Sequence, residues 1–212
     1  MRFTILILLL CCVGLLWGLD LIGSGSTAGD SDGGPVAHFQ ISGPAELGPA
    51  RAEEIYQSIR ESMAQHYAES SDPLAQTYQQ WVRANRFPYP SAAHGGIFVN
   101  NYTNSIAARQ FAARDRSGPY PAGSVVVKDG FIVTKEGNIL TGPLNIIEKL
   151  PPGEASTNAE DWRFIQIRPN GTVIGTAARD ERTRSCAQCH IQRNGAAAPF
   201  FFVPPGNEGS GH

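Results

Sequence analysis

One pentapeptide near the C-terminus, Cys186-Ala187-Gln188-Cys189-His190, restricts what this chain can fold into more than any other feature. Two thiols three positions apart can each form a thioether with a vinyl group of the same porphyrin, and the histidine that follows can ligate its iron. The sequence therefore predicts one covalently bound haem c, with Cys186 and Cys189 as attachment points and His190 as the iron ligand. The rest of the chain must then account for what that iron does.

Three other interpretations of this pentapeptide have to be weighed. A structural zinc ion needs four ligands, and the only other cysteines are Cys11 and Cys12 in an apolar N-terminal run. A thioredoxin-like redox pair would require a βαβ context that this stretch lacks. Chance occurrence is the third alternative, and an export signal argues against it.

The N-terminus has the pattern of such a signal. Met1-Arg2 precedes an apolar run from Phe3 to Leu19, and Ser26-Thr27-Ala28 offers a small-residue cleavage site. We expect residues 1–28 to be a signal peptide, with an uncleaved membrane anchor as the alternative. Export would take the chain to the periplasm, the compartment in which bacteria attach c-type haem.

Composition limits the remaining possibilities. Residues 29–47 are rich in Gly, Ser, Asp and Pro and predict a flexible linker, which leaves 48–205 for one domain and 206–212 for a frayed tail. The formal net charge is −2, with no basic cluster, so nucleic acid is not an expected partner.

The periodicity of apolar residues changes along the domain. It is helical after Pro49 and after Asp72-Pro73, where Asp72 is the expected N-cap and the second helix is expected to run through Trp81 and Val82. Strand patterns follow, and the strongest is Ser124–Val133, which is apolar on both faces. A short helix capped by Asn104 is also expected. The other expected strands are His94–Asn100, Ile139–Leu140 with Leu144–Leu150, Trp162–Ile167 and Thr172–Ile174. A turn at Asn170-Gly171 is expected to join the last two strands. The predicted fold class is α+β, a mainly antiparallel sheet with N-terminal helices and a C-terminal c-type haem motif.

The late position of the motif bears on the iron's sixth ligand. Only 22 residues follow His190, and none is methionine. Met63 lies on the apolar face of a predicted helix, where core packing is the favoured interpretation. The sequence thus favours an iron with one open face, and an open site binds small molecules. An electron-transfer cytochrome with Met63 or a histidine as sixth ligand is the alternative.

The order of segments resembles the cytochrome P-460 family. The resemblance spans about Leu74–Val203 and includes a helix with Tyr78 and Trp81, His94-Gly95-Gly96 before a strand, Ala122–Lys128, the Trp162 hairpin and the terminal haem motif. It implies a periplasmic mono-haem protein, typically a homodimer, that oxidises hydroxylamine and passes electrons to a soluble partner. It also implies the alternative of the related cytochromes c′-beta, which bind nitric oxide and similar gases without turnover.

The resemblance assigns roles to two further residues. Lys128 matches the lysine that is covalently linked to the haem edge in the enzymatic branch, and Glu181 matches a glutamate that acts there as general base. Strand alternation places Lys128 on the face of Val126, where burial would lower its pKa. The alternatives are a lysine that reaches water or pairs with Asp129, and a Glu181 that pairs with a neighbouring arginine.

Aromatic and histidine side chains complete the candidate site. His94 is either a distal hydrogen-bond donor or the anchor of a turn beside two glycines. The candidates for lining an apolar pocket that favours diatomic gases are Phe87, Phe98, Phe131 and Phe200–Phe202.

Overall fold

The computed structural model describes residues 45–154, 161–177 and 181–209. The predicted signal peptide and the linker as far as residue 44 lie outside these residues. Within the described ranges, no helix combines the length and the apolar character needed to cross a membrane.

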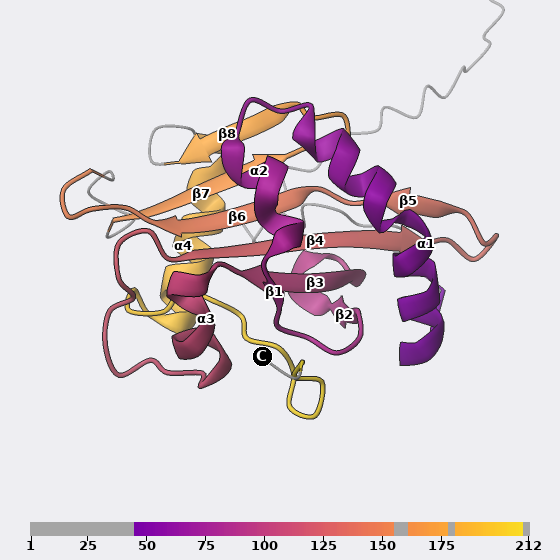
Figure 1. The fold of residues 1–212 in the computed structure, drawn as a ribbon, viewed down its shortest axis with the longest axis horizontal. Coiled ribbons are helices and arrows are strands. Elements are labelled where there is room, and N and C mark those ends of the chain that lie inside the picture. Colours follow the sequence, from indigo (N-terminus) through magenta and orange to yellow (C-terminus); the bar gives the residue numbers. More distant parts are fainter. Residues whose placement is uncertain (1–44, 155–160, 178–180, 210–212) are drawn as a thin grey trace, which may run out of the picture. The chain divides into compact units, whose positions relative to one another are not determined.

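Eight antiparallel strands form one sheet with the order β1-β3-β4-β6-β7-β8, in which β2 also pairs with β3 and β5 with β4 (Figure 1). This confirms the predicted α+β class with a mainly antiparallel sheet. The strands are β1 (Val82–Arg83), β2 (Tyr89–Ser91), β3 (Ile97–Thr103), β4 (Val125–Val133), β5 (Ile139–Thr141), β6 (Leu144–Lys149), β7 (Trp162–Ile167) and β8 (Val173–Ala177).

Helices α1, α2 and α3 begin where the sequence predicts helix starts, whereas α4 was not predicted as a helix. The first helix begins with Pro49, Asp72 accepts a hydrogen bond from the amide of Leu74, and Asn104 accepts one from the amide of Ala107. The described helices are α1 (Pro49–Ala68), α2 (Pro73–Thr77), the 3-10 turns η1 (Tyr78–Gln80) and η2 (Ala92–His94), α3 (Ser105–Ala112) and α4 (Glu181–Asn194).

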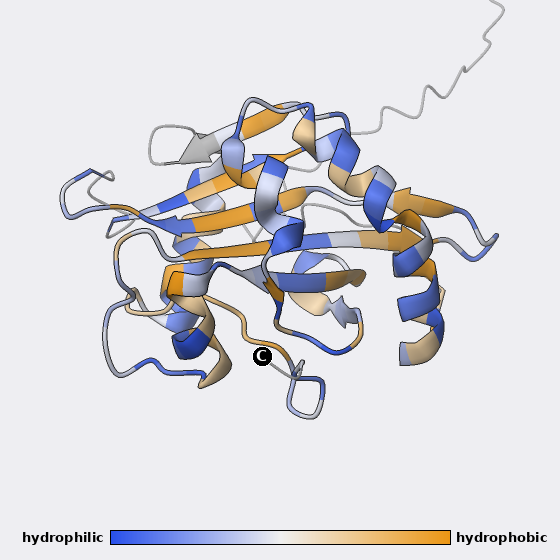
Figure 2. Cartoon of the chain, viewed as in Figure 1, coloured by the Kyte–Doolittle hydropathy of each residue, from blue (hydrophilic) through white to orange (hydrophobic). Residues whose placement is uncertain are grey.

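Strand β4 divides the core between the two faces of the sheet. All nine of its residues are buried. Val125 and Val127 pack with α1 and α2 on one face, whereas Val126 packs with α3, α4 and the C-terminal segment on the other. Figure 1 shows α1 and α2 in front of the sheet and α4 behind it, and Figure 2 shows hydrophobic residues along the central strands.

Two local predictions were wrong in their boundaries. The second helix stops at Thr77 because Trp81 is extended and Val82 pairs with Thr103 of β3, so sheet pairing overrides the helical pattern. The strand expected from His94 begins only at Ile97, after a turn with Gly95 in the left-handed conformation.

The C-terminal segment is more ordered than the predicted frayed tail. The amide of Arg86 donates to the carbonyl of Asn207, Asn85 forms a β-bridge with Glu208, and the amide of Gly209 donates to the carbonyl of Ala84. The described part of this segment, residues 206–209, is therefore held by backbone hydrogen bonds to residues 84–86, between β1 and β2.

The predicted hairpin between β7 and β8 has a turn that requires glycine. Gly171 has φ +74°, and its amide donates to the carbonyl of Arg168. A Cβ atom at this position would lie 2.7 Å from Cβ of Glu69 and 2.9 Å from the backbone nitrogen of Ser70. The hairpin tip therefore fits against the end of α1 only without a side chain.

Replacing Gly171 by alanine should lower the free energy of unfolding by about 2 kcal/mol or more, through backbone strain and the clash with the end of α1. Gly137 is a matched control because its φ is +86° and a Cβ atom on it would meet no other atom within 4 Å. Gly137→Ala should cost only the strain, about 1 kcal/mol. Urea denaturation of both variants measures the difference, and equal losses would contradict the proposed packing of the hairpin tip.

Candidate haem site

Helix α4 carries the whole Cys-x-x-Cys-His motif. Cys186 and Cys189 are half-buried thiols that form no disulfide within the described residues, and their spacing of three places them on neighbouring turns of one helix face. Burial raises the pKa of the Cys186 thiol, so it is held in the protonated form. The helix packs on β7 and β8, with Ala187 buried in the core on that side of the sheet. Neither sulfur takes part in a disulfide among the described residues, so both thiols can serve for thioether formation.

The imidazole of His190 is oriented by the backbone. Its Nδ1 lies 2.7 Å from the carbonyl oxygen of Pro199, and because a carbonyl can only accept, Nδ1 carries the proton. Phe164 and Phe201 flank the ring edge to face, at centroid distances of 5.6 and 4.8 Å. Burial, and next the nearby charge of Lys128, lower the pKa of His190 to about 4. The neutral ring therefore keeps its Nε2 lone pair, as a metal ligand must.

Lys128 lies on the same side of the sheet as α4. Lys128 is 8% exposed, and its Nζ atom is 5.8 Å from the centroid of the Phe201 ring. Burial lowers the pKa of Lys128 to about 8, so a larger fraction of its amine is neutral near pH 7 than in an ordinary lysine. The prediction from strand alternation is confirmed, and the alternative of a lysine that reaches into water does not fit this burial.

The alternative of an ion pair between Lys128 and Asp129 is wrong because the two side chains leave opposite faces of β4. Asp129 is fully buried and accepts hydrogen bonds from the hydroxyls of Tyr56 (2.9 Å) and Tyr78 (3.0 Å) and from the side-chain amide of Asn100 (3.1 Å). Burial raises the pKa of Asp129 to about 6, although these three hydrogen bonds act to lower it.

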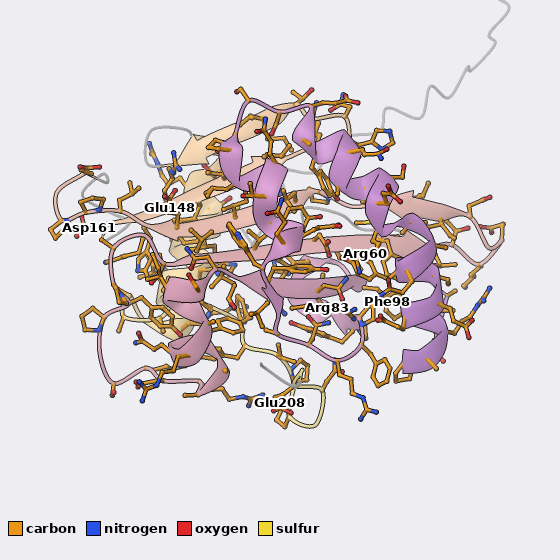
Figure 3. The ribbon with its side chains drawn as sticks, viewed as in Figure 1. Arg60, Arg83, Phe98, Glu148, Asp161 and Glu208 are labelled. Carbon is orange, nitrogen blue, oxygen red and sulfur yellow. The ribbon has the colours of Figure 1, made fainter. Side chains whose placement is uncertain are left out.

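This buried polar cluster on the α1 side was not predicted. The hydroxyls of Tyr56 and Tyr102 share a short hydrogen bond. Arg83, labelled in Figure 3, lies over the Tyr56 ring at 5.1 Å, and its guanidinium binds Glu53 of α1. Its members come from α1, η1, β1, β3 and β4, and the only sequence signal was an aspartate within an apolar strand. The cluster lies across the sheet from the haem motif.

His94 anchors a turn, as one of its two expectations states, and its role as a distal hydrogen-bond donor stays a prediction. Its Nδ1 shares a hydrogen bond of 2.8 Å with Oγ of Ser91, which anchors the turn before Gly95. Its ring also lies 6.2 Å from that of His190, centroid to centroid. The structure therefore brings His94 beside the motif as well as into the turn.

The remaining candidates separate clearly. Met63, Phe98 and Phe131 pack in the core on the α1 side, so the expectation that Phe98 and Phe131 line the haem pocket is wrong, as is Met63 as sixth ligand. Phe200 and Phe202 lie in the core on the α4 side, and Phe201 contacts His190. Phe87 lies by the C-terminal segment, where its amide donates to the side chain of Asn207.

Glu181 is the first residue of α4, but its side chain lies outside the described residues, so its role stays a prediction. Two contacts of His190, with Phe164 and with the Pro199 carbonyl, were missed. Alternation along β7 could have placed Phe164 on the α4 side, whereas nothing local predicts the Pro199 contact.

No family model and no curated protein matches the chain. The likeness to the cytochrome P-460 family thus rests on the order of segments between Leu74 and Val203. The donor set itself fits a covalent haem, because two thiols that form no disulfide and one neutral imidazole with its Nδ1 proton fixed lie on one helix, beside aromatic rings and a buried amine.

Proposed function

We propose that this chain is an exported mono-haem c-type cytochrome of the cytochrome P-460 type that oxidises hydroxylamine or otherwise processes nitrogen oxides. The observation that carries the proposal is the presence, on one helix, of Cys186 and Cys189 beside His190, whose Nδ1 donates to Pro199 and whose Nε2 is left for iron. Cys186 and Cys189 would hold the haem and His190 its iron, and the bound haem supplies a redox-active metal.

The protein's own groups serve this chemistry in distinct ways. The Pro199 carbonyl fixes the tautomer of His190, and Phe164 and Phe201 limit rotation of its ring and keep water away. Glu181, at the start of α4, is our candidate for the base that takes protons from hydroxylamine. Electrons would leave to a soluble partner, and we expect a periplasmic homodimer.

A gas-binding protein without turnover, as in the cytochromes c′-beta, is the second candidate. Phe164 and Phe201 contact His190, the expected iron ligand, so these rings do not decide between the two functions. An apolar wall on the open face would favour diatomic gases over polar ligands. Turnover separates the two functions.

Replacing Glu181 by alanine should lower the rate of hydroxylamine oxidation about 100-fold or more, the usual contribution of a general base. The assay is steady-state turnover with an artificial electron acceptor, at equal haem content. Glu136→Ala is the control, because Glu136 lies in the β4–β5 turn and is exposed. Equal rates for wild type and Glu181→Ala would remove this residue from the mechanism. Nitric oxide binding by a wild type without turnover would favour the gas-binding function.

The optical spectrum of the ferrous protein tests the role of Lys128. If the lysine is linked to the haem edge, the wild type should show a strongly red-shifted band, and Lys128→Met should show an ordinary c-type spectrum. Lys149→Met is the matched control because Lys149 lies over the Trp162 ring at the end of β6. An ordinary spectrum in the wild type would exclude the link.

A further inference from the structure

The chain turns sharply after α4 and returns to the motif histidine. Gly195, with φ +79°, follows the last helical residue, and its amide donates to the carbonyl of Ile191. Further on, the amide of Phe200 donates to the carbonyl of Ala198 at 2.7 Å, which closes a three-residue turn centred on Pro199. The carbonyl of Pro199 is the acceptor for His190, so the shape of this turn sets that hydrogen bond.

Arg116, in the loop between α3 and β4, holds both sides of the turn. Its Nη1 donates to the carbonyls of Asn194 (2.7 Å) and Ala198 (2.9 Å), and its Nη2 donates to the carbonyl of Phe200 (3.0 Å). The guanidinium also stacks on the ring of Phe202, at 4.5 Å from the centroid. Although Arg116 is exposed, three backbone carbonyls in a fixed geometry match its planar fork, which a lysine could not reproduce.

A second contact fixes the same segment from the sheet. Nε1 of Trp162 in β7 donates to the carbonyl of Ala196 at 2.8 Å, and its ring packs edge to face on Phe200. The backbone from Asn194 to Phe200 is therefore held by the sheet and by the α3–β4 loop, while one carbonyl in it, that of Pro199, is directed to His190.

We infer that Arg116 is a positioning residue for His190, because it fixes the carbonyls on both sides of Pro199 and thereby the acceptor of the Nδ1 proton. This inference rests on the proposed function, in which Nε2 of His190 binds haem iron. A firm hydrogen bond from Nδ1 makes the imidazole a stronger donor and favours ferric over ferrous iron. Loosening the turn should weaken that preference.

The test uses the full-length, haem-loaded protein with Arg116 replaced by methionine or by lysine. The readouts are haem content, the reduction potential and the iron–histidine stretching frequency of the ferrous protein by resonance Raman. Arg116→Met should keep the haem, lower the stretching frequency and favour ferrous iron about tenfold, which corresponds to a rise of about 59 mV. Arg116→Lys should shift both readouts in the same direction by less, since an ammonium group cannot span the three carbonyls.

Arg114→Met is the matched control. Arg114 lies in the same loop, but its guanidinium binds the carbonyl of Val203 and the carboxylate of Glu208, beyond the Pro199 turn. This variant should leave potential and frequency unchanged.

Two results would overturn the inference on Arg116 alone: wild-type values in Arg116→Met, or an equal shift in Arg114→Met. If Arg116→Met does not accumulate, wild-type values in Arg116→Lys decide against the inference in the same way. A wild type without covalent haem would overturn the proposed function as well, so the two failures are distinguishable.

Discussion

Replacing His190 by glycine should abolish hydroxylamine turnover and remove the iron–histidine stretching band of the ferrous protein, and added imidazole should restore part of both. The prediction follows from the geometry around the ring. Phe164 and Phe201 would enclose the space that the side chain leaves. The Pro199 carbonyl would remain to accept a hydrogen bond from the added imidazole. Haem content should stay close to that of the wild type, because Cys186 and Cys189 make the covalent bonds.

Steady-state turnover and resonance Raman spectra of the ferrous protein, with and without imidazole, measure the effect. His66→Gly is a suitable control, since His66 is exposed in the last turn of α1, on the other side of the sheet. If His190→Gly kept the iron–histidine stretching band and turned over like the wild type in the absence of imidazole, His190 would not be the iron ligand.

The second large effect concerns stability and comes from Asp129. Its pKa is raised by burial to about 6 from an ordinary value of 3.8, so the folded state binds the proton more tightly than the unfolded state. The resulting stabilisation is fully present below about pH 4 and is lost as the pH rises through 6. The free energy of unfolding of the wild type should therefore fall by about 3 kcal/mol relative to Asp129→Asn across this window.

Urea denaturation of both proteins at pH values between 3.5 and 7 gives the difference, in which groups that titrate in both proteins cancel. Asp115→Asn is the contrasting control. Hydrogen bonds from Ser117 lower the pKa of Asp115, so any difference there should have the opposite sign. Parallel pH profiles for wild type and Asp129→Asn would show that Asp129 does not titrate as its burial implies.

The sequence predicts best what short segments determine. Pro49, Asp72 and Asn104 mark helix starts because their backbone and side-chain chemistry suits those positions, and each prediction is confirmed. Alternation along β4 places Lys128 with Val126 for the same reason, since the strand period is two.

The errors arise where distant segments compete with local pattern. Trp81 and Val82 continue a helical stripe, yet pairing with β3 draws this stretch into the sheet. An apolar side chain such as that of Phe98 or Phe131 can be buried on either face of the sheet, so residue type alone could not predict that both pack on the α1 side. The hydrogen bonds from His190 to Pro199 and from Arg116 to the same turn are accepted by backbone carbonyls. Every residue type has such a carbonyl, so the sequence could not predict these two contacts.

Covalent haem attachment by Cys186 and Cys189 is the central claim, and the intact mass of the purified protein after acid extraction tests it most directly. Acid removes a haem held only by coordination, whereas thioether bonds survive. We predict the mass of the polypeptide plus one haem for the wild type, and that of the polypeptide alone for the double variant Cys186→Ala, Cys189→Ala. A wild-type mass equal to that of the polypeptide alone, from cells able to mature c-type cytochromes, would contradict the account.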